Sequence, residues 1–94
     1  MNRMRIRTQA GFIINFDNVY GIEYELKDFE EAGEWWVVSA VSMRNKSTAI
    51  GLYKTEAEAK KVVGEIYWCK TDYVAPGKMP EKIMEEVRRS GKNR

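Results

Sequence analysis

Histidine is absent from this chain of 94 residues, and cysteine occurs once, as Cys69. Because histidine is the side chain that ordinarily titrates near neutral pH, its absence removes the commonest general acid and base. A single thiolate without histidine cannot build the usual zinc sites within one chain. One cysteine also forms no internal disulfide, which is typical of a reducing compartment. With no histidine to activate it, Cys69 is interpreted as a small buried hydrophobe.

The motifs that cradle phosphates and dinucleotides are also missing. Neither GxxxxGKS/T nor GxGxxG occurs in the sequence, and no calcium-loop spacing is present. These absences predict that the chain is not an enzyme and that it holds no cofactor and no metal. No catalytic residue is therefore assigned.

Long apolar runs are absent as well. No segment approaches the ~18 consecutive apolar residues of a membrane-spanning helix. No apolar segment follows the basic residues of the N-terminus. The composition, 44% hydrophobic and 32% charged, is that of an ordinary globular domain. We therefore expect a cytoplasmic protein that makes no membrane contact.

The patterns that are present predict an α+β fold. Arginines alternate with Met4, Ile6 and Thr8 over residues 3–8, which is the period of a half-buried strand. Further strands with aromatic and β-branched residues are predicted at 12–16, 19–26, 35–43 and 48–53. The sequence therefore predicts an antiparallel meander of about five strands with one helix packed on it.

The packed helix begins where Thr55 supplies an N-cap and Glu58, three residues later, completes a capping box. The apolar residues of this helix recur at i, i+3, i+4 and i+7, namely at Ala59, Val62, Val63 and Ile66. This spacing predicts a stripe that faces the sheet.

The end of the chain predicts a second, short helix. Pro76-Gly77 interrupts the helical pattern, and Pro80 occupies a favourable first helical position. The predicted organisation is a core domain at 1–70, a connector at 71–78, and a short helix with a frayed tail at 79–94.

Three segments carry a shared pattern: "IRTQ" at 6–9, "INFDNV" at 14–19 and "IGLYKTEAEAKKVVGEI" at 50–66. Together they resemble small, mostly uncharacterised proteins of Gram-positive bacteria and their phages with an IRTQ…INxxNV…LGxYxTExEA pattern. The resemblance implies a compact β-sheet plus helix in an incomplete pleckstrin-homology-like arrangement. It implies no assigned chemistry. If a phage encodes the chain, the place of action is the cytoplasm of the host cell.

An arginine row is the first candidate binding feature. Arg3, Arg5 and Arg7 project from one face of one strand, about 6.5 Å apart. Guanidinium groups bind phosphate bidentately, so the row is a candidate site for a nucleotide or another small anionic ligand. The alternative is cross-strand pairing with Glu23 and Glu25 of a neighbouring strand. The net charge of +2 argues against a nucleic-acid partner.

Trp68 is the second feature, because it lies opposite the apolar stripe of its helix, with Gly64 one turn earlier on the same outer face. Either the second helix folds back over Trp68 within one chain, or this surface and that helix pack against another chain. The candidate residues of a homo-oligomer interface are accordingly Gly64, Trp68, Met79, Ile83 and Val87.

Trp35 and Trp36 are the third feature. Neighbours in a strand point to opposite faces, so one belongs to the core. The other covers a second face, forms a stacking platform for a base, or anchors a protein interface. Trp36 and Trp68 therefore join the arginines as candidate ligand contacts.

These features predict a non-enzymatic binding or inhibitor protein. The leading hypothesis is a phage-type anti-defence protein that sequesters a nucleotide-type ligand or occludes a host protein, by analogy with small phage proteins. The alternative is a structural or regulatory homo-oligomeric domain that binds protein and no small ligand. Nucleic-acid binding ranks third, because it requires arginines free of their acidic neighbours.

Overall fold

A computed structural model describes residues 4–92 and confirms the α+β class. The first sheet has the strand order β2-β1-β6, and its strands are β1 (Arg5–Arg7), β2 (Ile13–Asn15) and β6 (Tyr73–Val74). The second sheet is an antiparallel meander of β3 (Val19–Asp28), β4 (Glu34–Ser42) and β5 (Ser47–Tyr53). The other elements are helices α1 (Glu56–Trp68) and α2 (Glu81–Lys92), with 3-10 turns η1 (Phe16–Asn18) and η2 (Glu30–Ala32).

The strands thus divide into two sheets, where the sequence predicted one meander. The turn η1 separates them, and the Asn15 side chain fixes its start by accepting a hydrogen bond from the Asp17 N–H. The connector at 71–78 contains β6, which pairs parallel with β1 and places Tyr73 opposite Ile6. A two-residue strand carries no readable alternation, so the sequence pattern did not show it.

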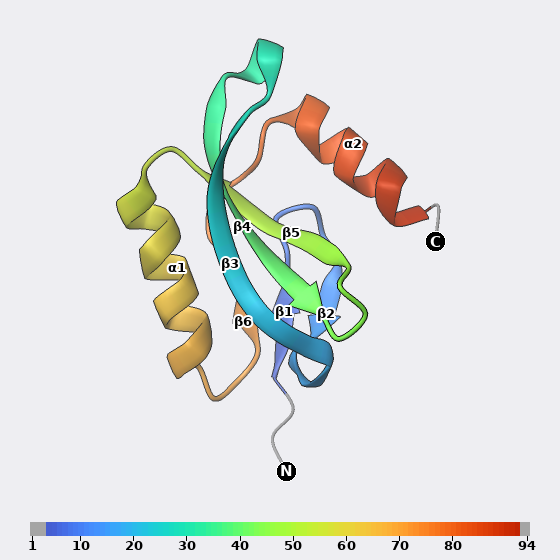
Figure 1. The fold of residues 1–94 in the computed structure, drawn as a ribbon, viewed down its shortest axis with the longest axis vertical. Coiled ribbons are helices and arrows are strands. Elements are labelled where there is room, and N and C mark those ends of the chain that lie inside the picture. Colours follow the sequence, from blue (N-terminus) through green and yellow to red (C-terminus); the bar gives the residue numbers. More distant parts are fainter. Residues whose placement is uncertain (1–3, 93–94) are drawn as a thin grey trace.

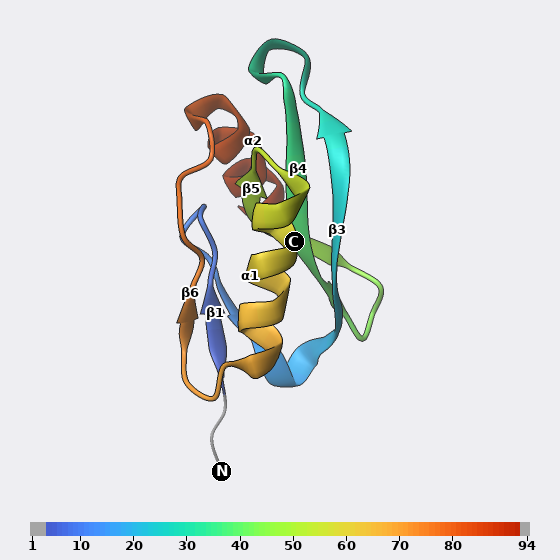
Figure 2. The same ribbon diagram turned by 90° about the vertical axis from the view of Figure 1, so that its left-hand side faces the viewer.

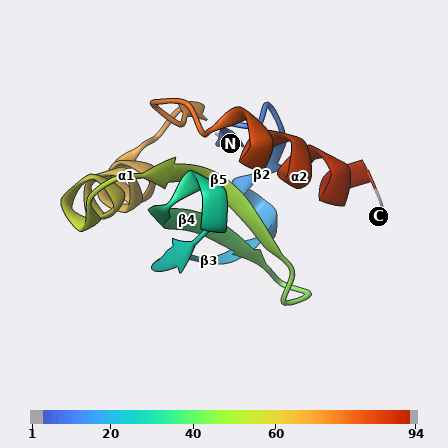
Figure 3. The same ribbon diagram turned by 90° about the horizontal axis from the view of Figure 1, so that it is seen from above.

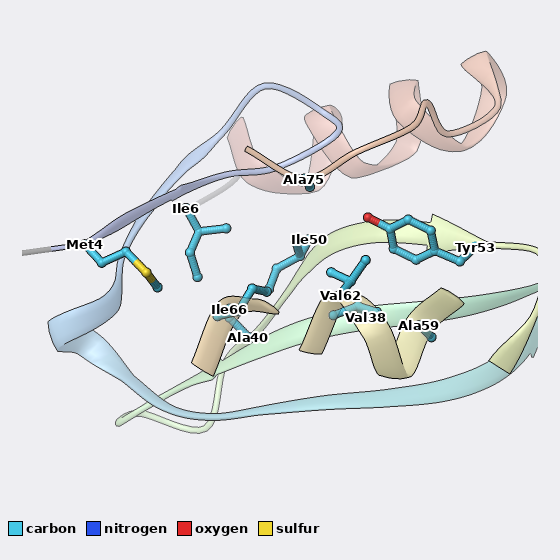
Figure 4. Packing of buried hydrophobic residues seen from close by; sticks show 10 residues of the cluster. All are labelled: Met4, Ile6, Val38, Ala40, Ile50, Tyr53, Ala59, Val62, Ile66 and Ala75. Atoms are coloured by element: carbon cyan, nitrogen blue, oxygen red, sulfur yellow. The ribbon is translucent and has the colours of Figure 1, made fainter. Parts of the chain in front are cut away.

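Helix α1 closes one side of the core. Ala59, Val62 and Ile66 are buried as predicted, and Val63 is partly buried at the margin. Figure 2, with α1 in front, shows β1 and β6 on one side of the helix and β3 and β4 on the other. Figure 4 shows the buried side chains of this cluster converging between the helix and both sheets. The helix therefore covers the joint between the sheets.

The capping box of α1 is confirmed in its first half. The Thr55 hydroxyl oxygen accepts a hydrogen bond from the Glu58 N–H at 3.2 Å. The second half differs, because the Glu58 carboxylate accepts from the Thr55 hydroxyl at 3.1 Å and not from a backbone N–H. One backbone donor of the first turn is thus satisfied.

Helix α2 lies on the opposite side of the meander from α1 (Figure 1). Alternation along β4 explains this, since Val38 faces the α1 cluster and Val37 faces Met79 and Ile83. Two polar contacts also hold α2: Lys82 forms an ion pair with Glu31 at 2.6 Å, and the Arg88 Nε donates to the carbonyl oxygen of Ala10 at 2.9 Å.

Gln9 joins the two sheets. Its backbone N–H donates to the Ile50 carbonyl at 2.8 Å, and its side-chain oxygen accepts from the Leu52 N–H at 2.9 Å. Its amide nitrogen donates to the Pro76 carbonyl at 2.7 Å. A Cβ on Gly51 would lie 2.9 Å from the Gln9 Cδ, so glycine is required beside it. Segments "IRTQ" and "IGLY" therefore meet at a structural joint.

No helix within residues 4–92 has both the length and the apolar character needed to cross a bilayer.

Candidate functional site

Two arginines of the predicted row, Arg5 and Arg7, are exposed on β1. Arg3 lies outside the described residues. Arg5 binds Asp72 through its guanidinium at 3.0 Å and through its backbone N–H at 3.1 Å. These hydrogen bonds lower the pKa of the Asp72 carboxyl. Arg7 is exposed and has no ion pair with any residue in the range 4–92.

The predicted pairing of the arginines with Glu23 and Glu25 is wrong. These glutamates lie on β3 in the meander, whereas β1 belongs to the other sheet. Strand alternation predicts which face a side chain takes, but it does not identify the neighbouring strand.

The two adjacent tryptophans take opposite faces, as predicted. Trp36 packs against the α1 cluster, with its ring centroid 5.9 Å from that of Tyr24. Trp35 lies on the α2 side, where its indole N–H donates to the Ala32 carbonyl at 2.8 Å and Lys54 Nζ lies 3.8 Å from its ring centroid. Both rings are partly covered within the chain.

Trp68 is 84% exposed, and α2 does not cover it. The predicted cover within one chain is therefore wrong. Met79 and Ile83 are buried on the other side of the meander, and Val87 is partly buried beside them. Gly64 remains on α1, where an added Cβ would meet no atom within 4 Å. The predicted interface residues consequently lie on two separate surfaces.

A hollow of about 550 Å³ lies between α2 and the meander, and we refer to it as the α2 hollow. Its apolar wall comes from β4, β5, α2 and the loops before β2 and η2, and includes Phe12, Phe29, Val37, Leu52, Ile83 and Val87. The main polar groups at the hollow are Lys27, Ser39, Lys46 and Glu86. This volume lies within the range of small-molecule pockets.

Ser39 is the most informative residue of the α2 hollow. It is only 9% exposed and lies on β4 between apolar neighbours. Its hydroxyl makes no hydrogen bond with the described residues, whereas the other buried polar residue, Thr8, accepts from the Phe12 N–H at 3.0 Å. No fully buried side-chain nitrogen or oxygen atom in the described residues lacks a hydrogen-bond partner, so the Ser39 hydroxyl is accessible from the hollow that it lines. There it offers a donor and an acceptor to a bound molecule.

Lys46 supplies positive charge at the hollow. The β4–β5 hairpin positions it, because the Ser42 hydroxyl oxygen accepts from the N–H groups of Arg44 and Lys46, each at 3.2 Å. Asn45 between them has φ 61°, which asparagine tolerates better than most residues. Neither Arg44 nor Lys46 has a carboxylate within ion-pair distance in the described part of the chain. Lys27 pairs with Glu25 at 3.4 Å.

A second depression of about 520 Å³ adjoins the first, between β2 and the β4–β5 hairpin. Phe12 and Lys46 line both, so the two meet at the start of β5. Arg44 and Asn15 line the second depression only. The ammonium group of Lys46 can therefore reach an anionic group in either space.

Residues 4–92 contain no group of three or more cysteine, aspartate or glutamate side chains arranged to hold a metal ion. Cys69 is partly buried at the end of α1, and its thiol donates to the Thr71 carbonyl at 3.0 Å.

Sequence reasoning did not find the α2 hollow. The one available signal was Ser39, a polar residue inside the most apolar strand of the chain. The other lining residues come from distant segments that only the fold brings together.

Comparison of the chain with models of known protein families, with curated proteins and with solved structures finds no match. The resemblance to small phage-type proteins therefore stays a prediction.

Proposed function

We propose that this chain is a non-enzymatic binding protein that holds a nucleotide-type anionic ligand in the α2 hollow. The Ser39 hydroxyl carries the proposal, because it lines the hollow, has no hydrogen-bond partner among the described residues, and is therefore available to a ligand.

The chemistry of the wall supports this ligand class. The rings of Phe12 and Phe29 offer apolar faces to a base, and base–aromatic stacking contributes about 1–3 kcal/mol. Lys46, which has no carboxylate within ion-pair distance among residues 4–92, offers an ammonium group to a phosphate. A mononucleotide presents both an aromatic base and a phosphate group. The hollow is therefore matched to it in polarity as well as in size.

Sequestration is the proposed mode of action. A binding protein without catalytic groups lowers the free concentration of its ligand by holding it. Such a protein acts as an inhibitor of any pathway that uses the ligand as a signal, which agrees with the phage-type resemblance and an anti-defence role in the host cytoplasm.

Native mass spectrometry of the full chain purified from cells tests the proposal directly. We expect an added mass in the nucleotide range, and titration calorimetry with nucleoside mono-, di- and cyclic phosphates then identifies the class. Ser39→Ala removes one hydrogen bond and should weaken binding by about fivefold. Lys46→Ala should weaken it by about tenfold or more and reduce its salt dependence.

Lys61→Ala is the matched control, because Lys61 is an exposed lysine on α1, on the other side of the meander. It should bind like the wild type. Absence of any adduct together with no heat of binding across the nucleotide panel contradicts the proposal.

Trp68 favours a second candidate function, occlusion of a host protein. A tryptophan that is 84% exposed is unusual on a free surface, and tryptophan is enriched among residues that dominate protein interfaces. A photocrosslinking residue placed at position 68 should capture one discrete host protein if this holds, and the same residue at position 61 should not. Equal, diffuse crosslinking at both positions argues against it.

A further inference from the structure

The outer edge of β3 has no neighbouring strand within the described residues. β3 contains ten residues and pairs only with β4. Figures 2 and 3 both show β3 at the margin of the molecule, with no strand or helix on its outer side. An exposed edge of this length presents unpaired backbone groups to any strand of matching pattern.

The hydrogen bonds at the two ends of β3 show which backbone groups point outward. The Phe29 N–H donates to the Gly33 carbonyl at 2.9 Å, which closes the β3–β4 hairpin. Backbone hydrogen bonding alternates along an antiparallel pair, so the N–H and C=O groups of Tyr24 and Leu26 point away from β4. Ile22 confirms the alternation, because its N–H donates to the Tyr67 hydroxyl at 3.0 Å. In the described chain the outward groups of Tyr24 and Leu26 have no partner.

We propose that a second copy of this chain pairs antiparallel with β3 along this edge, with the two-fold axis at Leu26. Leu26 then lies opposite the partner's Leu26, and both residues direct their backbone groups toward the other copy. Tyr24 lies opposite the partner's Asp28 in the same register. This isologous arrangement is the commonest symmetry of homo-oligomers.

The charges on facing residues favour the register with the axis at Leu26. With the axis at Leu26, Glu25 faces the partner's Lys27 and Lys27 faces the partner's Glu25. An axis at Glu25 also brings Glu23 opposite the partner's Lys27, but it places two glutamates face to face at the centre. An axis at Tyr24 places Glu23 opposite the partner's Glu25. Opposite charges on facing positions stabilise an antiparallel pair, whereas like charges destabilise it. Of these three registers, only the axis at Leu26 pairs opposite charges without also placing like charges opposite each other.

The exposure of Leu26 in the single chain supports the same surface. Its side chain is 47% exposed, and the neighbouring rings of Tyr24 and Trp36 lie on the same face of the sheet. The partner's Leu26 would cover it. This inference needs no bound ligand, and Lys27 is the residue that the proposed pairing shares with the lining of the α2 hollow.

Sedimentation equilibrium of the full chain over a concentration series tests the pairing. The wild type should show a monomer–dimer equilibrium. Glu25→Lys places a second lysine opposite the partner's Lys27, and Lys27→Glu places two glutamates opposite each other. Each change should raise the dimer dissociation constant by about tenfold or more, since two facing pairs become repulsive.

Mixing the two single variants provides the decisive measurement. Their chains carry complementary charges, so an equimolar mixture should restore dimer formation, and the double variant E25K/K27E should dimerise like the wild type. Both side chains are exposed, so folding should be unchanged, and circular dichroism checks this. A wild type that stays monomeric, single variants that dimerise normally, or a mixture that stays monomeric each overturns the proposal. Dimer formation by the Ser39→Ala variant is measured separately, because Ser39 lies in the hollow and not on the edge of β3, so failure of one proposal leaves the other intact.

Discussion

The two faces of the β3-β4-β5 meander are built from the same strands, yet they are packed to different degrees. On the α1 face, the side chains of Ile6, Val38, Ile50 and Ile66 are fully buried. On the α2 face, Met79 and Ile83 are buried, but the α2 hollow remains beside them. One sheet therefore has a closely packed core on one side and an open hollow on the other.

The difference follows from how each helix is attached. Only Lys54 and Thr55 separate β5 from α1, so the helix must fold back onto the adjacent face. α2 follows a connector that also forms β6. Its position is held by Ile83, by Met79 just before the helix, and by the contacts of Lys82 with Glu31 and of Arg88 with Ala10. Elements with fewer buried contacts open at lower free energy, so we expect α2 to open more readily than α1.

Truncation of one isoleucine on each face is the strongest test of this comparison. Ile50→Ala should lower the free energy of unfolding by about 2–5 kcal/mol, because it leaves a cavity in a fully packed cluster. Ile83→Ala should lower it by about 2 kcal/mol or less, since the surroundings of Ile83 already include open space. Urea denaturation followed by tryptophan fluorescence measures both. Equal losses would show that the two faces are packed alike.

Substitutions at two glycines test whether the joint at Gln9 is closely packed and the outer surface of α1 is open. Gly51 lies at the joint, and Gly64 lies on α1. At Gly51 an added Cβ would lie 2.6 Å from the Tyr53 hydroxyl oxygen and 2.9 Å from the Gln9 Cδ. Gly51→Ala should therefore destabilise the protein by about 1–3 kcal/mol. Gly64→Ala meets open space on α1 and should stabilise it by about 0.5–1 kcal/mol. Thermal unfolding should give shifts of opposite sign, and shifts of the same sign would contradict the geometry of the joint.

The alkaline limit of stability reports on the α1 face alone. Burial raises the pKa of Tyr53 to about 12. Burial, followed by its hydrogen bond to Glu65, also raises the pKa of Tyr73. Tyrosine in the unfolded chain ionises near pH 10, at about its reference value. The unfolded state therefore loses these protons first, and the stability that they provide is lost as the pH rises from about 10 to about 12.

Urea midpoints measured between about pH 9 and 12 test this dependence. Tyr53→Phe should flatten the decline, and Tyr20→Phe, a change at an exposed position, should follow the wild type. A decline of the same steepness in Tyr53→Phe would show that the Tyr53 hydroxyl is not responsible.

Much of the fold could be predicted from local patterns. The alternation at Met4, Ile6 and Thr8, the N-cap at Thr55 and the stripe on α1 each depend on neighbours in sequence, and the structure confirms them. The pairing of β1 could not be predicted in this way. Its partners include β6, which is distant in sequence and too short for a period to be recognised.

The candidate site could be predicted to a smaller extent. An arginine row is conspicuous in a sequence, yet Arg5 is satisfied by Asp72, a residue 67 positions away. The α2 hollow depends on the distance that α2 keeps from the meander, and that distance is set by packing and not by any local pattern. Ser39 was visible as a polar residue among apolar ones, but its lack of a partner is a property of the assembled structure.

The Gln9 joint has a consequence for the kinetics of folding. Its side chain bonds to Leu52 and Pro76, which lie 43 and 67 positions away in sequence. Contacts that close such long loops are entropically expensive to form early, so we expect them to be absent from the transition state. Interactions that form after the transition state slow unfolding and leave the folding rate nearly unchanged. The amide of Gln9 is thus expected to set the lifetime of the folded chain more than the time that the chain needs to fold.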